Sequence, residues 1–124
     1  MYESLDVYRT SAALARHAGQ RQALAAIDVA NADTPGFRAR SLPPFAETLD
    51  GAPPMQRTRP GHLGGLDAPA ARPVDAGGEA SPNGNTVSLE AEIYASAQAS
   101  REHGQALAIW RHATQVLRTV ISSR

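Results

Sequence analysis

The four histidines have the most versatile side-chain chemistry in this chain, because imidazole serves as a metal ligand and as a general acid or base. They are His17, His62, His103 and His112. No two of them are three or four residues apart, the spacing that places two ligands on one face of a helix. The chain also has no Cys, which removes thiolate ligands and a thiol nucleophile. We therefore expect solvated or packed histidines and no metal site.

Carboxylates and glycines are the next groups whose spacing could indicate chemistry. Glu90 and Glu92 are two residues apart, so they do not share a helical face and are better explained as complements to a helix N-terminus than as an acid–base pair. The glycines between residues 61 and 78 match no phosphate-binding loop. The sequence predicts no catalytic residue, no cofactor and no small-molecule substrate, and hence a protein that is not an enzyme.

Length and composition argue against a self-sufficient core. Of 124 residues, 42% are hydrophobic, but 24 are Ala and only 22 are Leu, Ile, Val or Phe. Twelve basic residues, all Arg, balance twelve acidic ones, so no net field favours nucleic acid, and we predict no nucleic-acid partner. We expect the isolated chain to be largely unfolded or loosely helical, with copies or partners completing its core.

The N-terminal third predicts a long helix that stops abruptly. Helix formers run from about residue 4 to residue 32, and the small and apolar positions repeat every three or four residues. The stop lies at Thr34–Gly36, because Pro35 disfavours helix at the preceding residue and Gly36 can adopt a positive φ. Pro followed by Gly suits the centre of a type II turn.

Between residues 41 and 84 the chain has eight of its nine Pro and seven of its ten Gly, which predicts an irregular segment. A second long helix should begin near Ser88, which could cap it. We therefore divide the chain into 1–36 (helix and turn), 37–86 (Pro/Gly-rich irregular insert) and 87–124 (helix). The predicted fold is mainly α, with the two terminal helices pairing as a coiled-coil-like hairpin. The larger residues expected to pack the helices are Leu5, Tyr8, Leu24, Val29, Leu89, Ile93, Leu107, Trp110, Leu117 and Ile121.

Two short motifs carry a family resemblance. The first consists of Ala30, Asn31, Asp33, Thr34, Pro35, Gly36 and Phe37; it resembles the Ala-Asn-x-x-Thr-Pro-Gly-aromatic signature of bacterial flagellar rod and hook proteins. The second, Asn83 followed by Gly84, Asn85, Thr86 and Val87, is similar to the Asp-Gly-Asn-x-Val of the proximal rod (FlgB) type. Residues 58–63, which include His62, resemble a third and weaker landmark. Phe37, Asp28 and Asn83 depart from the usual Tyr, Asn and acidic residue.

The resemblance implies a structural subunit of the flagellar basal-body rod, which transmits torque across the periplasm for motility. Its expected partners are other rod subunits, the inner-membrane ring and the type III export apparatus, in a homo- and hetero-oligomeric helical assembly. The start of the chain has no basic segment followed by an apolar run, so we expect export to the rod without a cleaved signal peptide.

Two interpretations stay open at this point. Phe45 and Leu49 resemble the Phe-x-x-x-aliphatic motif by which early axial subunits dock on the export gate, but they would equally pack one face of a short helix. The runner-up function is a non-enzymatic amphipathic-helix protein that binds a membrane surface or a partner coiled coil through residues 105–121, where Arg111 and Arg118 stand among apolar residues.

Overall fold

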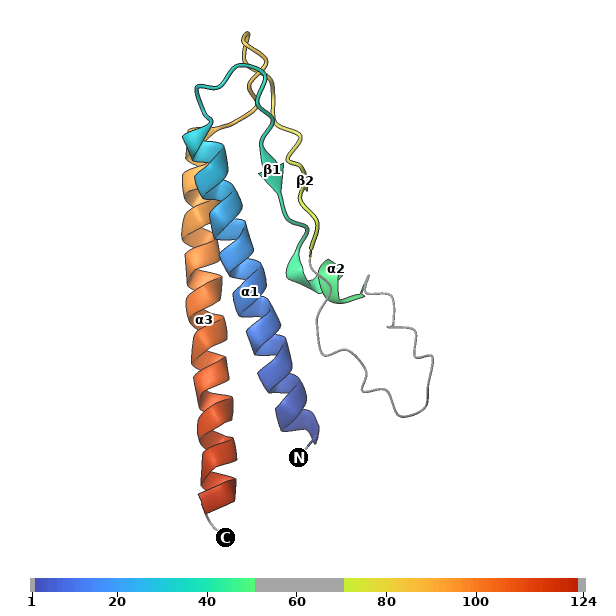
Figure 1. The fold of residues 1–124 in the computed structure, drawn as a ribbon, viewed down its shortest axis with the longest axis vertical. Helices are drawn as coiled ribbons and strands as arrows, with labels where there is room; N and C mark the ends of the chain where they lie inside the picture. The colour runs from blue at the N-terminus through green and yellow to red at the C-terminus, as the bar shows by residue number, and fades with distance from the viewer. Residues whose placement is uncertain (1, 51–70, 123–124) are drawn as a thin grey trace.

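The computed structural model describes residues 2–50 and 71–122, and two long helices dominate it. Helix α1 (Tyr2–Ala30) and helix α3 (Leu89–Ser122) lie side by side and run in opposite directions, so both chain ends lie at the same end of the molecule (Figure 1). The predicted fold class is confirmed: the protein is mainly helical, and its terminal helices pack as a hairpin. The end of the hairpin at which α1 stops and α3 begins is called the closed end below.

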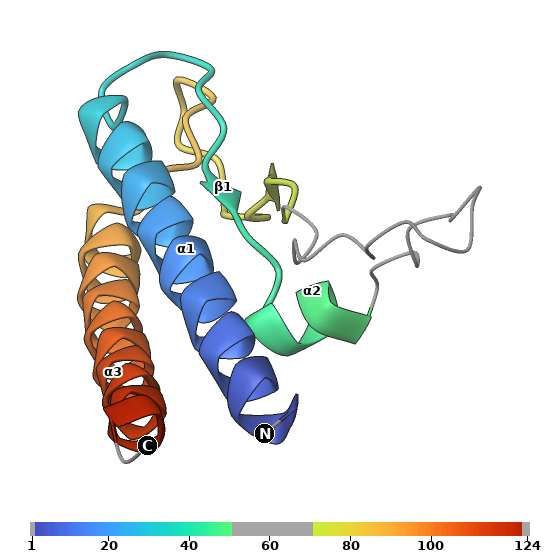
Figure 2. The same cartoon turned by 60° about the horizontal axis from the view of Figure 1, so that its bottom comes forward.

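The insert returns along one side of the hairpin. Strand β1 (Arg40–Ser41) pairs antiparallel with strand β2 (Val74–Asp75), with Arg40 opposite Asp75, and helix α2 (Phe45–Asp50) follows β1. Both views place these elements beside α1, on the side away from α3 (Figures 1 and 2). The regular elements of the insert are short, because Pro and Gly interrupt helix and strand alike. Residues 58–63, with His62, lie outside the described residues.

The predicted helix boundaries are close to those observed, and the local signals explain them. The Phe37 amide donates to the Thr34 carbonyl at 3.2 Å, and Gly36 has a φ of 71°, as expected for a type II turn with Pro at its second position. At the start of α3, the Ser88 hydroxyl accepts from the Ala91 amide at 3.5 Å, so Ser88 caps this helix as predicted.

Small residues form the contact between the two long helices. Ser11, Ala18 and Ala25 are buried at seven-residue intervals in α1, and Ala99, Ala106 and Ala113 are buried at the same interval in α3. A seven-residue repeat keeps one face of each helix against its partner. Small side chains on that face allow the two backbones to approach closely, so Ala, not Leu, fills this core.

The larger apolar residues flank that contact instead of forming it. Within the hairpin, the packing prediction is wrong for Val29, Leu89, Ile93 and Ile121, which are 40%, 49%, 65% and 75% exposed, because the Ala repeat occupies the face between the helices. Residues that are half-buried beside the core are Tyr8, Leu24, Leu107, Trp110 and Leu117. The side chain of Leu5 lies outside the described part of the structure. Packing of the exposed residues against other chains stays a prediction.

Among the residues that the structure describes, no helix has a long enough apolar stretch to cross a bilayer.

Candidate functional site

The two sequence motifs meet at the closed end of the hairpin. The Gly36 amide donates to the Asn83 carbonyl at 3.0 Å, and the Thr86 amide donates to the Phe37 carbonyl at 3.1 Å. We call residues 30–40 together with residues 83–87 the motif junction. Segments almost fifty residues apart in the chain therefore form one hydrogen-bonded unit, and this unit is the candidate functional site.

Asn85 is the central side chain of the motif junction. It is 2% exposed, and its Nδ2 donates to the carbonyls of Asn31, Ala32 and Thr34 at 2.9, 2.8 and 2.8 Å. Its Oδ1 accepts from the Val87 amide at 2.7 Å, which fixes the orientation of the amide group. One side chain from the second motif thus satisfies carbonyls released at the end of α1.

Glycine is required where the two motifs cross. Gly36 and Gly84 both have a positive φ, of 71° and 80°, and a Cβ on Gly84 would lie 3.4 Å from the Gly36 Cα. A third glycine, Gly78, supports the second motif from outside, because a Cβ there would lie 2.7 Å from the Thr86 carbonyl oxygen. Sequence reasoning identified Gly36 and Gly84 but missed Gly78.

The remaining residues of the first motif make local contacts. Asn31 Nδ2 donates to the Ile27 carbonyl at 2.8 Å, and its Oδ1 accepts from the Thr34 hydroxyl at 3.2 Å. Ala30, Asp33 and Pro35 are exposed, and Phe37 is half-buried. The motif therefore ends α1 through Asn31 and Thr34 and leaves its other polar side chain, Asp33, in solvent.

Hydrogen bonds to two buried side chains extend the motif junction toward β1. The Ala39 amide donates to Thr86 Oγ1, and the Arg40 amide donates to Asp28 Oδ2, both at 2.9 Å. Asp28 is fully buried, and its Oδ1 has no hydrogen-bond partner. Burial raises the pKa of the nearby Glu92, and the charge of Asp28 raises it further.

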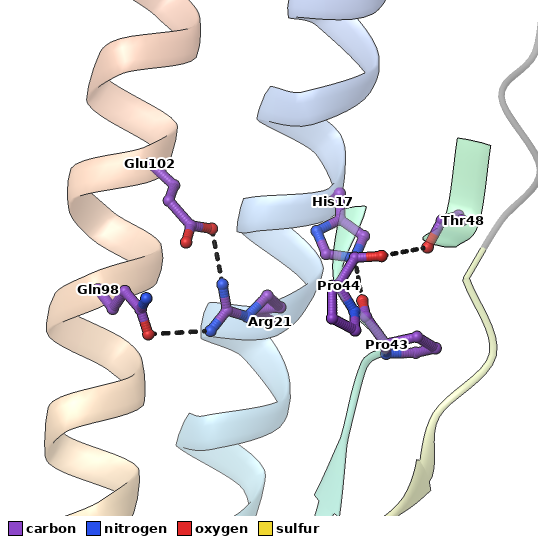
Figure 3. A network of polar contacts seen from close by, with 7 residues as sticks. All are labelled: His17, Arg21, Pro43, Pro44, Thr48, Gln98 and Glu102. Carbon is purple, nitrogen blue, oxygen red and sulfur yellow. Dashed lines mark hydrogen bonds and ion pairs between the residues drawn. The ribbon is translucent and has the colours of Figure 1, made fainter. Parts of the chain in front are cut away.

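Phe45 and Leu49 lie on α2, away from the motif junction. The Phe45 ring is 5.5 Å from the ring of His17, which is buried on α1, whereas Leu49 is 39% exposed. His17 Nε2 lies 2.9 Å from the Pro43 carbonyl and must donate to it, because a carbonyl only accepts (Figure 3). These contacts favour the packing interpretation for Phe45, while export-gate docking stays a prediction.

Polar and aromatic contacts join the two helices along their length. Arg21 donates to Glu102 Oε2 at 2.6 Å and to Gln98 Oε1 at 3.4 Å (Figure 3). The end of the hairpin opposite the closed end is called the free end below. Nearer to it, the Tyr8 and Trp110 rings lie 5.4 Å apart. A single sequence has no signal for the Arg21–Glu102 pair, because its partners are 81 residues apart.

The described residues bring together polar groups suited to holding a backbone turn. No cluster of three or more His, Cys, Asp or Glu in the described ranges could hold a metal ion. His103 is half-buried and His112 exposed, both on α3, and Glu90 lies exposed in the first turn of that helix. Apart from the Thr34–Asn31 pair, the hydrogen bonds given above for the motif junction connect backbone to backbone or side chain to backbone, so they hold the backbone of the turn in place.

No protein-family model matches the chain, and no curated protein matches it. The resemblance to flagellar rod proteins therefore depends on the motif residues themselves.

Proposed function

We propose that this chain is a structural subunit of the bacterial flagellar basal body, in the proximal rod. One observation carries the proposal: the two segments on which the family resemblance depends lie against each other, joined by the Gly36–Asn83 and Thr86–Phe37 backbone hydrogen bonds and by Asn85. The hairpin alone brings these segments near each other, because one follows α1 and the other precedes α3; the buried Asn85 and the positive-φ glycines are what join the motif residues specifically. The contact between the two motifs supports the idea that both motifs belong to one structural unit.

The proposed role is to transmit torque across the periplasm through a self-assembled array of hairpins. In such an array α1 and α3 are the stiff elements, and the motif junction locks their relative position at the closed end. The exposed Val29, Leu89, Ile93 and Ile121 support self-assembly, because apolar side chains along one molecule favour burial against another. The partners in this proposal are other rod subunits, the inner-membrane ring and the export apparatus, and the protein is not an enzyme.

Mass spectrometry of detergent-purified basal bodies, from the bacterium that encodes this chain, tests the proposal. We expect its peptides in amounts comparable with those of the other rod proteins. In a deletion strain, a Gly36→Val copy should be exported but not incorporated, whereas the control Gly19→Ala should restore motility, since a Cβ on Gly19 meets nothing within 4 Å. Intact, functional basal bodies that lack the chain would contradict the proposal.

The competing interpretation, a helix that binds membranes or a coiled coil through residues 105–121, has weaker support. Trp110 is the largest apolar side chain of that segment, and it packs on Tyr8 within the hairpin. Co-sedimentation with anionic liposomes separates the two interpretations, because a rod subunit should stay in the supernatant.

A further inference from the structure

A groove lies between the two helices near the closed end, beside the Ala contact. It has a volume of about 470 Å³ and is lined on α1 by Gln22, Ala25, Ala26 and Val29, and on α3 by Glu92, Ile93, Ser96, Ala97 and Ser100. We call it the stem groove. Most of its lining is apolar, and Glu92 is its only ionisable side chain. It therefore suits an apolar side chain accompanied by one cation.

Helix α3 separates charge along its length, with carboxylates at the stem groove and cations at the other end. Its first turn carries Glu90 and Glu92, whereas every charged residue between 103 and 122 is an Arg or a His. Near the free end Arg118 and Ile121 are one turn apart and exposed. Within the described ranges, the Arg118 guanidinium has no ion-pair or hydrogen-bond partner. The free end thus carries a cation and an apolar side chain on adjacent turns.

We infer that the stem groove of one copy receives the free end of α3 from a second copy, with Arg118 against Glu92 and Ile121 between Ile93 and Ser96. This inference rests on the self-assembly in the proposed function and assigns that contact to named residues. In two parallel helices that place residue 118 at the level of residue 92, residue 121 lies at the level of residue 95; Ala95 does not line the stem groove, and the lining residues nearest that level are Ile93 and Ser96.

The electrostatics of the stem groove also favour a cation. Glu92 has a raised pKa because it is partly desolvated and lies near the buried Asp28. The charge of an incoming guanidinium would act in the opposite direction and lower the pKa of Glu92, because it favours the carboxylate form.

The inferred contact joins different surfaces of identical copies and shifts each copy along the helix axis, so it does not close into a ring. Each copy has one stem groove and one free end, and head-to-tail contacts of this kind generate open filaments. Successive copies would be displaced by the 26 residues between 92 and 118, which is about 40 Å along α3 at 1.5 Å per residue. A rod built from hairpins that are displaced along a common axis would contain head-to-tail contacts of this kind.

Disulfide trapping tests the contact on the purified full chain, because the chain has no Cys of its own. Ser96→Cys and Ile121→Cys are introduced together. Their separation along α3 is about 38 Å, far beyond the reach of a disulfide, so any bond must join two copies. Under mild oxidation we expect a ladder of dimers, trimers and longer species on a denaturing gel. The control is Gln20→Cys with Ile121→Cys, since Gln20 is exposed on α1 outside the stem groove.

Charge reversal in the same Cys background supplies the decisive comparison. Arg118→Glu should weaken association at least about tenfold, and adding Glu92→Arg should restore the ladder. Cross-linking no stronger than with the control pair, or a ladder unaffected by Arg118→Glu, would overturn the inference. Since the assay uses the purified chain alone, its failure leaves the presence of the chain in basal bodies as a separate question. A ladder from a chain that basal bodies lack would instead support the contact and contradict the rod proposal.

Discussion

The closed end of the hairpin differs from its open flank, the side along which the stem groove lies, in which groups are buried and which are exposed. At the closed end, Asn85 and Thr86 are buried and hydrogen-bonded, and two positive-φ glycines bring the motifs together. Along the flank, Ile93 and Val29 line the stem groove, and both are substantially exposed. At the closed end the buried Asn85 and Thr86 find their hydrogen-bond partners within the chain and Asp28 Oδ1 does not, whereas the flank leaves apolar surface without cover from its own chain.

This difference separates what one chain completes alone from what it leaves for others. Directional hydrogen bonds fix the turn that places α1 beside α3, and they need no second molecule. The Ala contact between the helices buries little apolar area per residue, so it contributes less stability than a core of Leu and Ile would. We therefore expect substitutions at the motif junction to affect the fold of each chain and substitutions on the flank to affect association.

The largest effect is expected from Asn85→Asp. The new carboxylate has the same shape but no donor, and it would face the carbonyls of Asn31, Ala32 and Thr34 in a buried site. We predict a loss of about 3 kcal/mol or more in the free energy of unfolding. Denaturant titration in a stabilising osmolyte measures it. The control is Asn83→Asp, which keeps the acceptor for the Asn85 amide and should change stability by less than about 0.5 kcal/mol.

A smaller effect is expected from Gly36→Val. Its φ of 71° is unfavourable for a β-branched residue, and the cost should be about 1–3 kcal/mol. Gly19→Ala should instead stabilise the chain by about 0.5–1 kcal/mol, because Gly19 lies inside α1 with free space around it. Equal effects of the two substitutions, by the same titration, would show that the motif junction does not hold the turn.

The Arg21–Glu102 pair should contribute less again. Both side chains keep about a quarter of their exposure, so solvent screens the interaction. A double-mutant cycle with Arg21→Ala and Glu102→Ala should give a coupling of about 0.5–1 kcal/mol. The exposed Arg9–Asp6 pair, at 3.7 Å, is the matched control and should give a coupling near zero. A stronger coupling for Arg9–Asp6 would contradict the assignment of the Arg21 pair as the link between the helices.

The smallest effect concerns pH. The pKa of Glu92 is raised above its ordinary value of 4.5, first by burial and then by Asp28, so the hairpin favours the protonated form. The resulting stability is fully present below pH 4.5 and is lost as the pH rises through the raised pKa. We therefore predict that Glu92→Gln is more stable than the parent chain at pH 7, and that the difference disappears below pH 4.5. A difference independent of pH in thermal unfolding would contradict this.

Periodicity and turn chemistry predicted most of the fold, because their signals are local. Pro35 with Gly36 predicted the end of α1, and Ser88 predicted the start of α3. The choice of the buried face was wrong: the larger apolar residues were expected to pack the two helices, whereas the helices pack through small residues such as Ala18 and Ala106. Two of the residues expected to pack the helices, Val29 and Ile93, line the stem groove instead.

The motif junction was predicted only in part. Both motifs were identified, but their mutual contact and the burial of Asp28 depend on residues far apart in the chain. The residue pattern of a single sequence does not indicate which residues far apart in the chain come into contact. Asp28, which departs from the Asn of the family resemblance, occupies a buried position and has one unpartnered oxygen.

Residue-resolved amide hydrogen exchange of the purified chain, at low and high concentration, tests the central claim most directly. The account predicts that the amides of Gly36, Ala39 and Thr86 are protected already at low concentration, because their hydrogen bonds form within one chain. Protection along the stem groove and the free end of α3 should rise with concentration as other copies cover them. Uniform protection along α1 and α3 that does not change with concentration would contradict the account.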